Sequence, residues 1–177
     1  MGLPVILYLL VSATIAAAYP TGAGICYANE SAIAAVGSMG PSNDNLGYAL
    51  VVGGQATSYS PGRALNVTLT GNQNFMGLLL YAASAIDATA HAGTWSGLDA
   101  DKFMFLNNDQ GPVDCSTYGI NATVTHDSPM SKSVPLTFTW TPSSTTIGDV
   151  HFYSVVVVSD TVGFQVLQSA KALTAAA

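Results

Sequence analysis

Apolar and polar residues alternate with a period of two in several segments after Tyr48. In residues 65–70 (LNVTLT) and 136–141 (LTFTWT), every second residue is apolar and the residues between are Asn or Thr. Successive side chains of a β-strand point to opposite faces, so this pattern predicts strands with one buried face. Asn66 would then lie on the outward face, and Trp140 in the core.

Two other segments are apolar almost throughout. Residues 75–81 (FMGLLLY) and 151–158 (HFYSVVVV) predict central strands that are covered, wholly or partly, on both faces. Gly77 lies inside the first and indicates a bulge or a close backbone approach. Weaker strand candidates share short apolar runs: residues 48–52, 103–106, 121–125 and 164–167.

Turn residues separate these segments, and helical patterns are short. The Pro61-Gly62 pair predicts a type II turn, because Pro presets one φ and Gly accepts the positive φ that follows. Residues 31–36 could form one helical turn, and the Ala-rich stretch 82–92 is better interpreted as a loop crossing. About eight short strands with little helix predict an all-β, antiparallel β-sandwich.

The beginning of the chain has the features of a secretory signal peptide. Residues 3–18 carry no charge and end in three alanines, which predicts cleavage before Tyr19. A retained anchor is the alternative, but this run is shorter than the ~20 residues that span a bilayer, and no basic flank follows. We expect a signal peptide at 1–18, one domain at 19–168, a short tail at 169–177, and a secreted, extracellular product without a membrane span.

Cysteines and glycosylation motifs agree with secretion. Cys26 and Cys115 are the two cysteines, and an even count in an oxidising compartment predicts a disulfide, with free thiols or an intermolecular pair as alternatives. Asn29, Asn66 and Asn121 each begin an N-x-S/T motif, so they are predicted N-glycosylation sites that must face solvent.

Composition excludes some function classes. The 177 residues include ten acidic and four basic ones, for a net charge of −6, and only 8% are charged. Four scattered cations cannot form the basic surface that nucleic acids require, so no nucleic-acid partner is expected. Hydrophobicity is too high and charge too low for a disordered chain.

Motifs for catalysis and metal binding are missing from the sequence. The three histidines lack zinc-ligand spacing, and no nucleophile elbow or phosphate-binding loop occurs. Asp99 and Asp101 supply two of the six or more oxygens that calcium needs, so a solvated loop is favoured. His126, beside Asp127, could be an oriented base, but a local hydrogen bond is favoured. We expect no catalytic residue, no metal, no cofactor and no enzyme activity.

Aromatic residues are the remaining candidates for ligand contact. Trp95 lies in a Gly-Thr-Trp-Ser-Gly segment, where flanking glycines suggest a flexible loop, and an exposed ring could stack on a sugar. The alternative is packing, because Trp is highly buried on average. Trp95, Tyr59 and His126 are the candidate ligand contacts.

Several segments, taken in order, resemble the reelin (Reeler) domain family. They share short motifs at similar positions: 19–26 (YPTGAGIC), 59–69 (YSPGRALNVTL), 75–82 (FMGLLLYA), 93–95 (GTW), Cys115 with 125–126 (TH), 136–140 (LTFTW) and 150–157 (VHFYSVVV). The resemblance covers about residues 19–160. It implies an extracellular, immunoglobulin-like β-sandwich in which Cys26 and Cys115 are bonded.

The resemblance also suggests a role. Small Reeler-like proteins are implicated in innate defence, so it implies a secreted recognition or adhesion module that binds microbial surface glycans or lipids. Net acidity argues against charge attraction to anionic cell walls, so binding should depend weakly on salt. The alternative is a structural protein of the extracellular matrix that self-associates through its sheet edges. The sequence leaves the oligomeric state open.

Overall fold

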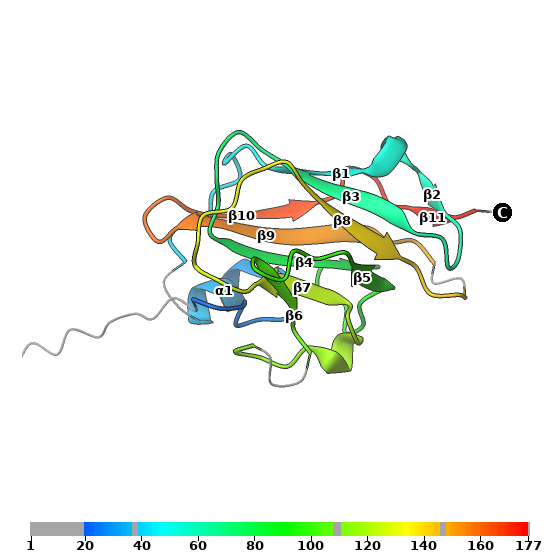
Figure 1. Ribbon diagram of the computed structural model, residues 1–177, viewed down its shortest axis with the longest axis horizontal. Coiled ribbons are helices and arrows are strands. Elements are labelled where there is room, and N and C mark those ends of the chain that lie inside the picture. The colour runs from blue at the N-terminus through cyan, green and yellow to red at the C-terminus, as the bar shows by residue number, and fades with distance from the viewer. Residues whose placement is uncertain (1–19, 37–38, 108–110, 146–147, 177) are drawn as a thin grey trace, which may run out of the picture.

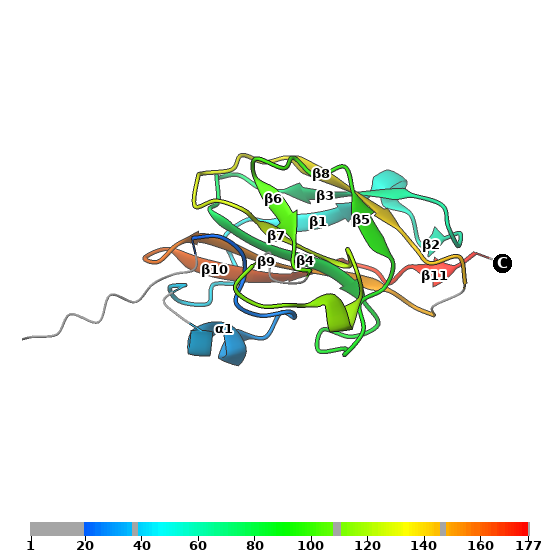
Figure 2. The ribbon, with the colours of Figure 1, turned by 60° about the horizontal axis from the view of Figure 1, so that its bottom comes forward.

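The computed structural model of the chain describes residues 20–36, 39–107, 111–145 and 148–176. Two β-sheets lie one above the other, and the short helix α1 (Glu30–Val36) lies on the outer side of one of them (Figures 1 and 2). The predicted all-β, antiparallel sandwich is confirmed. The predicted signal peptide falls outside the described residues.

One sheet has four antiparallel strands in the order β1-β3-β8-β5. They are β1 (Ala49–Val52), β3 (Leu65–Thr70), β8 (Leu136–Thr141) and β5 (Thr94–Ser96). The alternating segments form its centre, with the apolar positions turned inward and the Thr and Asn positions less buried. The period-two pattern therefore predicted both central strands and their buried face.

The other sheet has five antiparallel strands in the order β10-β9-β4-β7-β6. They are β10 (Gly163–Gln168), β9 (His151–Ser159), β4 (Gly77–Ala83), β7 (Thr123–His126) and β6 (Phe103–Phe105). Every residue of β4 is buried, which confirms that its continuous apolar sequence is covered on both faces.

The start of β4 differs from the prediction. The strand begins and ends two residues later than the segment 75–81. The reason is that Phe75 pairs with a different partner, exchanging two backbone hydrogen bonds with Lys132 at 3.0 and 2.7 Å. At Gly77 the predicted close approach is present: a Cβ added there would lie 3.1 Å from the Cβ of Val157.

Residues 169–176 are part of the fold, contrary to the predicted tail. The side chain of Leu173 is fully buried, and its backbone pairs with Val150. The strand β11 (Thr174–Ala175) then pairs in parallel with β2 (Ser58–Tyr59). The segment is rich in small residues, so its apolar pattern was too weak to predict this strand, and the domain extends through residue 176.

Short connections complete the structure. Two 3₁₀ turns, η1 (Gly53–Gln55) and η2 (Ser116–Tyr118), follow β1 and precede β7. The predicted turn at Pro61-Gly62 is present, with Gly62 at φ 72° and a 3.0 Å hydrogen bond from the Arg63 amide to the Ser60 carbonyl.

Large aromatic residues fill the space between the two sheets. Trp140 of β8 meets Phe152 of β9 edge to face, with ring centroids 5.0 Å apart, and Phe138 meets Phe103 in the same way at 5.2 Å. Such edge-to-face pairs add to the stabilisation from burial alone. This inter-sheet core holds the two sheets together.

Candidate functional site: an apolar pocket under the amino-terminal segment

The five-stranded sheet has a second apolar face, which points away from the other sheet. Leu79 and Tyr81 of β4 lie beside Val155 and Tyr153 of β9 on this face, in register. With Ile33 of α1 they belong to a second buried cluster, separate from the inter-sheet core. Because an apolar sheet face cannot remain open to water, another part of the chain must cover it.

Residues 20–28 and α1 provide this cover. Backbone hydrogen bonds hold the segment in place: the Gly22 amide donates to the His126 carbonyl at 2.8 Å, and the Ala23 amide to the Thr125 hydroxyl at 2.8 Å. Further along, the Ala28 amide donates to the Tyr81 hydroxyl at 2.9 Å. Each bond ties the segment to a strand of the sheet below it.

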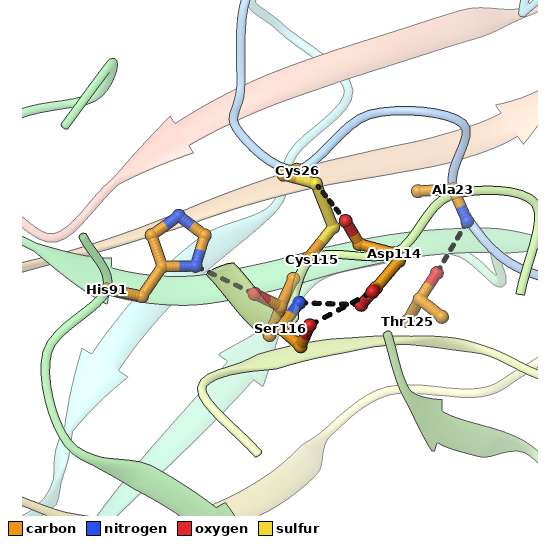
Figure 3. The surroundings of a disulfide bond; sticks show 8 residues. Ala23, Cys26, His91, Asp114, Cys115, Ser116 and Thr125 are labelled. Carbon is orange, nitrogen blue, oxygen red and sulfur yellow. Dashed lines mark hydrogen bonds between the residues drawn. A yellow bond between two sulfur atoms is a disulfide. The ribbon is translucent and has the colours of Figure 1, made fainter. Parts of the chain in front are cut away.

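A disulfide secures the same segment (Figure 3). Cys26 and Cys115 are joined, with Cα atoms 5.5 Å apart, across 89 positions of sequence. Cys115 is itself fixed, because its amide donates to the Leu106 carbonyl at 2.9 Å. Asp114 accepts hydrogen bonds from the amide and hydroxyl of Ser116, which begins η2. The bridge therefore anchors the cover to the loop between β6 and β7.

The cover leaves a pocket of about 320 Å³ against the sheet. Ile25 and Ile33 line it from the cover, and Leu79 and Val155 line it from the sheet. Gly77 enlarges it, because a side chain at this position would press on Val157. The side chains with polar groups around the pocket belong to His126, Ser159 and Asp160.

A buried lysine holds part of the rim. The ammonium of Lys132 donates to three carbonyls, those of Met76, Ser128 and Met130, at 2.7–2.8 Å. Burial lowers the pKa of Lys132, since water no longer solvates its charge. Met76 and the neighbouring Pro129 both line the pocket. Lys132 thus positions the rim, and all three of its N–H groups are used in doing so.

His126 lies at the pocket but not as an exposed base. The residue is buried, and its Nδ1 accepts a hydrogen bond from the Leu78 amide at 3.2 Å. The same nitrogen lies 3.3 Å from the Leu78 carbonyl oxygen and 3.4 Å from the Thr125 hydroxyl. The contact reaches across to the neighbouring strand β4, so sequence proximity to Asp127 did not indicate it.

Trp95 and Tyr59 are packed inside the molecule. Trp95 is 2% exposed and its indole N–H donates to the Ala122 carbonyl at 3.1 Å, while Tyr59 is 1% exposed. Trp95 lies in β5 rather than in a flexible loop. The alternation of Thr, Trp and Ser at 94–96 was the signal for a strand. Neither ring offers a face to a sugar from solvent in this structure.

His91 is a buried group that the sequence did not indicate. It stacks on Tyr81 with ring centroids 4.2 Å apart, and its Nδ1 shares a 2.7 Å hydrogen bond with the Thr123 hydroxyl. Its Nε2 has no hydrogen-bond partner among the described residues. Burial lowers the pKa of His91 from 6.5 to about 4, because the charged ring would be poorly solvated there.

The predicted glycosylation sites differ in exposure. Asn66 and Asn29 are exposed, and the Asn29 side chain accepts a 3.0 Å hydrogen bond from the Ala32 amide at the start of α1. Asn121 is half-buried and its side chain bonds to that of Asn107. Glycosylation remains a prediction, with Asn66 and Asn29 the more accessible sites.

Neither a metal site nor a membrane-spanning helix is present among the described residues. No three His, Cys, Asp or Glu residues among them gather as a metal site would require. Asp99 forms an ion pair with Lys102 at 2.6 Å. No helix in the described part of the chain is long and apolar enough to cross a membrane.

Solved structures share this architecture. A crystal structure of the human F-spondin reeler domain superposes with a TM-score of 0.59 at 21% identity, covering 78% of this chain and 95% of that one. The Reelin-N domain of F-spondin gives a TM-score of 0.58 at 21% identity, covering 79% of this chain and 94% of that one. At this identity the likeness shows the fold alone. A search of curated proteins finds no match.

The two sheets, the disulfide and these neighbours define the chain as an immunoglobulin-like β-sandwich module. The model of the Reeler domain family matches residues 31–175, and the chain belongs to that family. The resemblance seen in the sequence is therefore confirmed. Reeler domains are extracellular modules rather than enzymes.

Proposed function

We propose that this protein is a secreted recognition module that binds the apolar part of a microbial surface lipid in the pocket beneath residues 20–28. The observation that carries the proposal is the pocket itself. It measures about 320 Å³, is lined mainly by aliphatic side chains, and has polar side chains at only three lining positions. Small-molecule sites have this combination of an apolar wall and a few placed polar groups.

Burial of the aromatic candidates favours a lipid over a glycan. Stacking on a sugar requires an exposed ring, and both Trp95 and Tyr59 are packed in the inter-sheet core. An aliphatic wall instead gains free energy by removing apolar surface from water, at about 25 cal/mol per Å². Such binding would depend weakly on salt, as expected for a chain with a net charge of −6.

The alternative role in a self-associating matrix has less support in the structure. Open sheet edges promote association when they are long and unprotected. Here β5 and β6 have three residues each and β1 has four. The outer edge of the longer strand β10 is bonded at Phe164 to residues 41 and 43, through hydrogen bonds of 3.0 and 2.8 Å. Sedimentation at increasing concentration should therefore give a single, unchanging species.

A binding experiment with a glycolipid and its deacylated glycan tests the proposal. The purified protein should bind vesicles carrying a bacterial glycolipid and should not bind the same glycan after its acyl chains are removed. Binding should persist at 0.5 M salt, roughly three times physiological ionic strength. Equal binding of the deacylated glycan would contradict the proposal and would indicate a glycan-binding site on the protein surface.

A further inference from the structure

We infer that the pocket holds one unbranched alkyl chain, and that its rim selects an uncharged or cationic head group over an anionic one. This inference rests on the proposed function and names its ligand class. It follows from the direction, the size and the rim charges of the pocket.

The lining residues of β9 recur at every second position, Val155, Val157 and Ser159. Leu79 pairs with Val155, and two positions further along Gly77 pairs with Val157, so consecutive lining positions follow the strand axis. Ser159 continues the line at the end of β9. From Val155 to Ser159 the strand rises about 13 Å. A linear group therefore fits the direction of the pocket better than a compact one.

The volume suits a single chain. About 320 Å³ is close to the lower limit of the 300–1,000 Å³ that small-molecule sites occupy. Met39 and Met76 are among the lining residues, and methionine adapts its shape to flexible apolar ligands. Two acyl chains would need a larger space, so a diacyl lipid could insert only one of its chains.

The rim supplies the head-group preference. Asp160 lines the pocket and is exposed, and none of the described residues that line the pocket is a lysine or an arginine. The nearby ammonium of Lys132 cannot bond to an anionic head, because three carbonyls already take its N–H groups and it is 1% exposed. An anionic head would therefore meet a like charge at the rim, without a donor to compensate.

Displacement of the neutral fluorescent probe N-phenyl-1-naphthylamine tests the inference. Alkyl maltosides of increasing length, kept below their micelle concentrations, should displace the probe with an affinity that rises about threefold to fourfold per CH₂. The rise should level off once the pocket is full. At equal length and low salt, an alkyl trimethylammonium should bind about twofold to fivefold more tightly than an alkyl carboxylate, as for an exposed charge pair.

Four variants locate the effect. Val157→Phe should abolish displacement by filling the space beside Gly77, and Ile25→Phe should do the same from the cover. Val51→Phe is the matched control, because Val51 is exposed on β1 of the other sheet and should leave affinity unchanged. Asp160→Asn should remove the difference between ammonium and carboxylate heads.

The outcomes separate this inference from the proposed function. If both blocking variants keep the circular dichroism spectrum and the affinity of the parent, the pocket is not the site and both proposals fail. If alkyl maltosides bind without a plateau in chain length, or if the anionic series binds most tightly, the inference is wrong. Binding of glycolipid vesicles would then still support the proposed function.

Discussion

The two faces of the five-stranded sheet are buried in different ways. The inner face packs on the other sheet through large aromatic rings, and Val156 and Phe152 are fully buried there. The outer face packs under a short segment and one helix of seven residues, and a pocket of about 320 Å³ remains. One sheet therefore has both a close-packed side and an incompletely filled side.

The two modes of packing explain why the sequence of β4 is apolar throughout. A strand that faced water on one side would alternate, whereas β4 is apolar on both. The inner side uses its apolar residues for cohesion between the sheets. The outer side uses them as the floor of a site, with a cover that depends on a few hydrogen bonds and one disulfide.

Removing the disulfide should have the largest effect, and mainly on the outer face. The bridge closes 89 residues of sequence, so the double variant Cys26→Ser/Cys115→Ser should lower the free energy of unfolding by about 4–5 kcal/mol. Chemical denaturation measures this change. In the native state, amide hydrogen exchange should speed up most at Ala23 and Ala28, which hold the cover.

The sandwich provides the control for this experiment. Amides of β3 and β8 should exchange in the variant only as fast as global unfolding allows. Binding of the fluorescent probe should weaken before the aromatic circular dichroism signal of the inter-sheet core is lost. Equal acceleration on both faces would show that the bridge stabilises the whole domain and not the cover in particular.

Acid should have the second-largest effect, and this effect also concerns the outer face of the sheet. The folded pKa of His91 is about 4 against 6.5 when unfolded, so the unfolded chain binds more protons between these values. The stability that His91 supports is complete above about pH 6.5 and falls by up to about 3 kcal/mol as the pH drops to about 4. Denaturation at a series of pH values measures this loss.

A variant isolates the contribution of this histidine from that of the carboxylates. His91→Gln cannot take up a proton, so the pH dependence between 6.5 and 4 should become shallower by a similar amount. His151→Gln is the matched control, because His151 is only half-buried and lies at the start of β9. An unchanged slope in the His91 variant would mean that other groups govern the acid response.

The smallest expected effect compares two adjacent valines. Val156→Ala removes a side chain from the close-packed inner face and should cost about 2–3 kcal/mol, the loss of two buried carbons plus a cavity. Val155→Ala enlarges a pocket that already exists and should cost about 1 kcal/mol less. Thermal or chemical denaturation measures both.

Binding of the fluorescent probe provides a second comparison of Val155→Ala with Val156→Ala. Val155→Ala should change the affinity of the pocket for N-phenyl-1-naphthylamine, whereas Val156→Ala should leave it within twofold of the parent. Similar costs and similar affinities in the two variants would remove the distinction between the faces.

Local patterns in the sequence predicted much of the fold. The alternation in residues 65–70 and 136–141 placed Val67 and Phe138 in the core, because side-chain direction along a strand has a fixed period. The turn at Pro61-Gly62 was predicted for a similar reason, since both residues restrict or extend the local backbone angles. The resemblance to the Reeler family also predicted the disulfide partners.

Other features depended on contacts between distant segments. The burial of Trp95, the packing of Leu173 and the partner of His126 each require a neighbour far away in the sequence. Only the path of residues 20–28 across β7 creates the pocket, because no single segment encloses it.

Which residues avoid water and which positions form turns can be predicted from the sequence alone, because both are properties of side chains and local backbone angles. Which apolar surface is tightly packed and which keeps a pocket depends on the tertiary structure. That outcome depends on the shapes of segments that meet after folding, and the composition of either segment alone does not specify it.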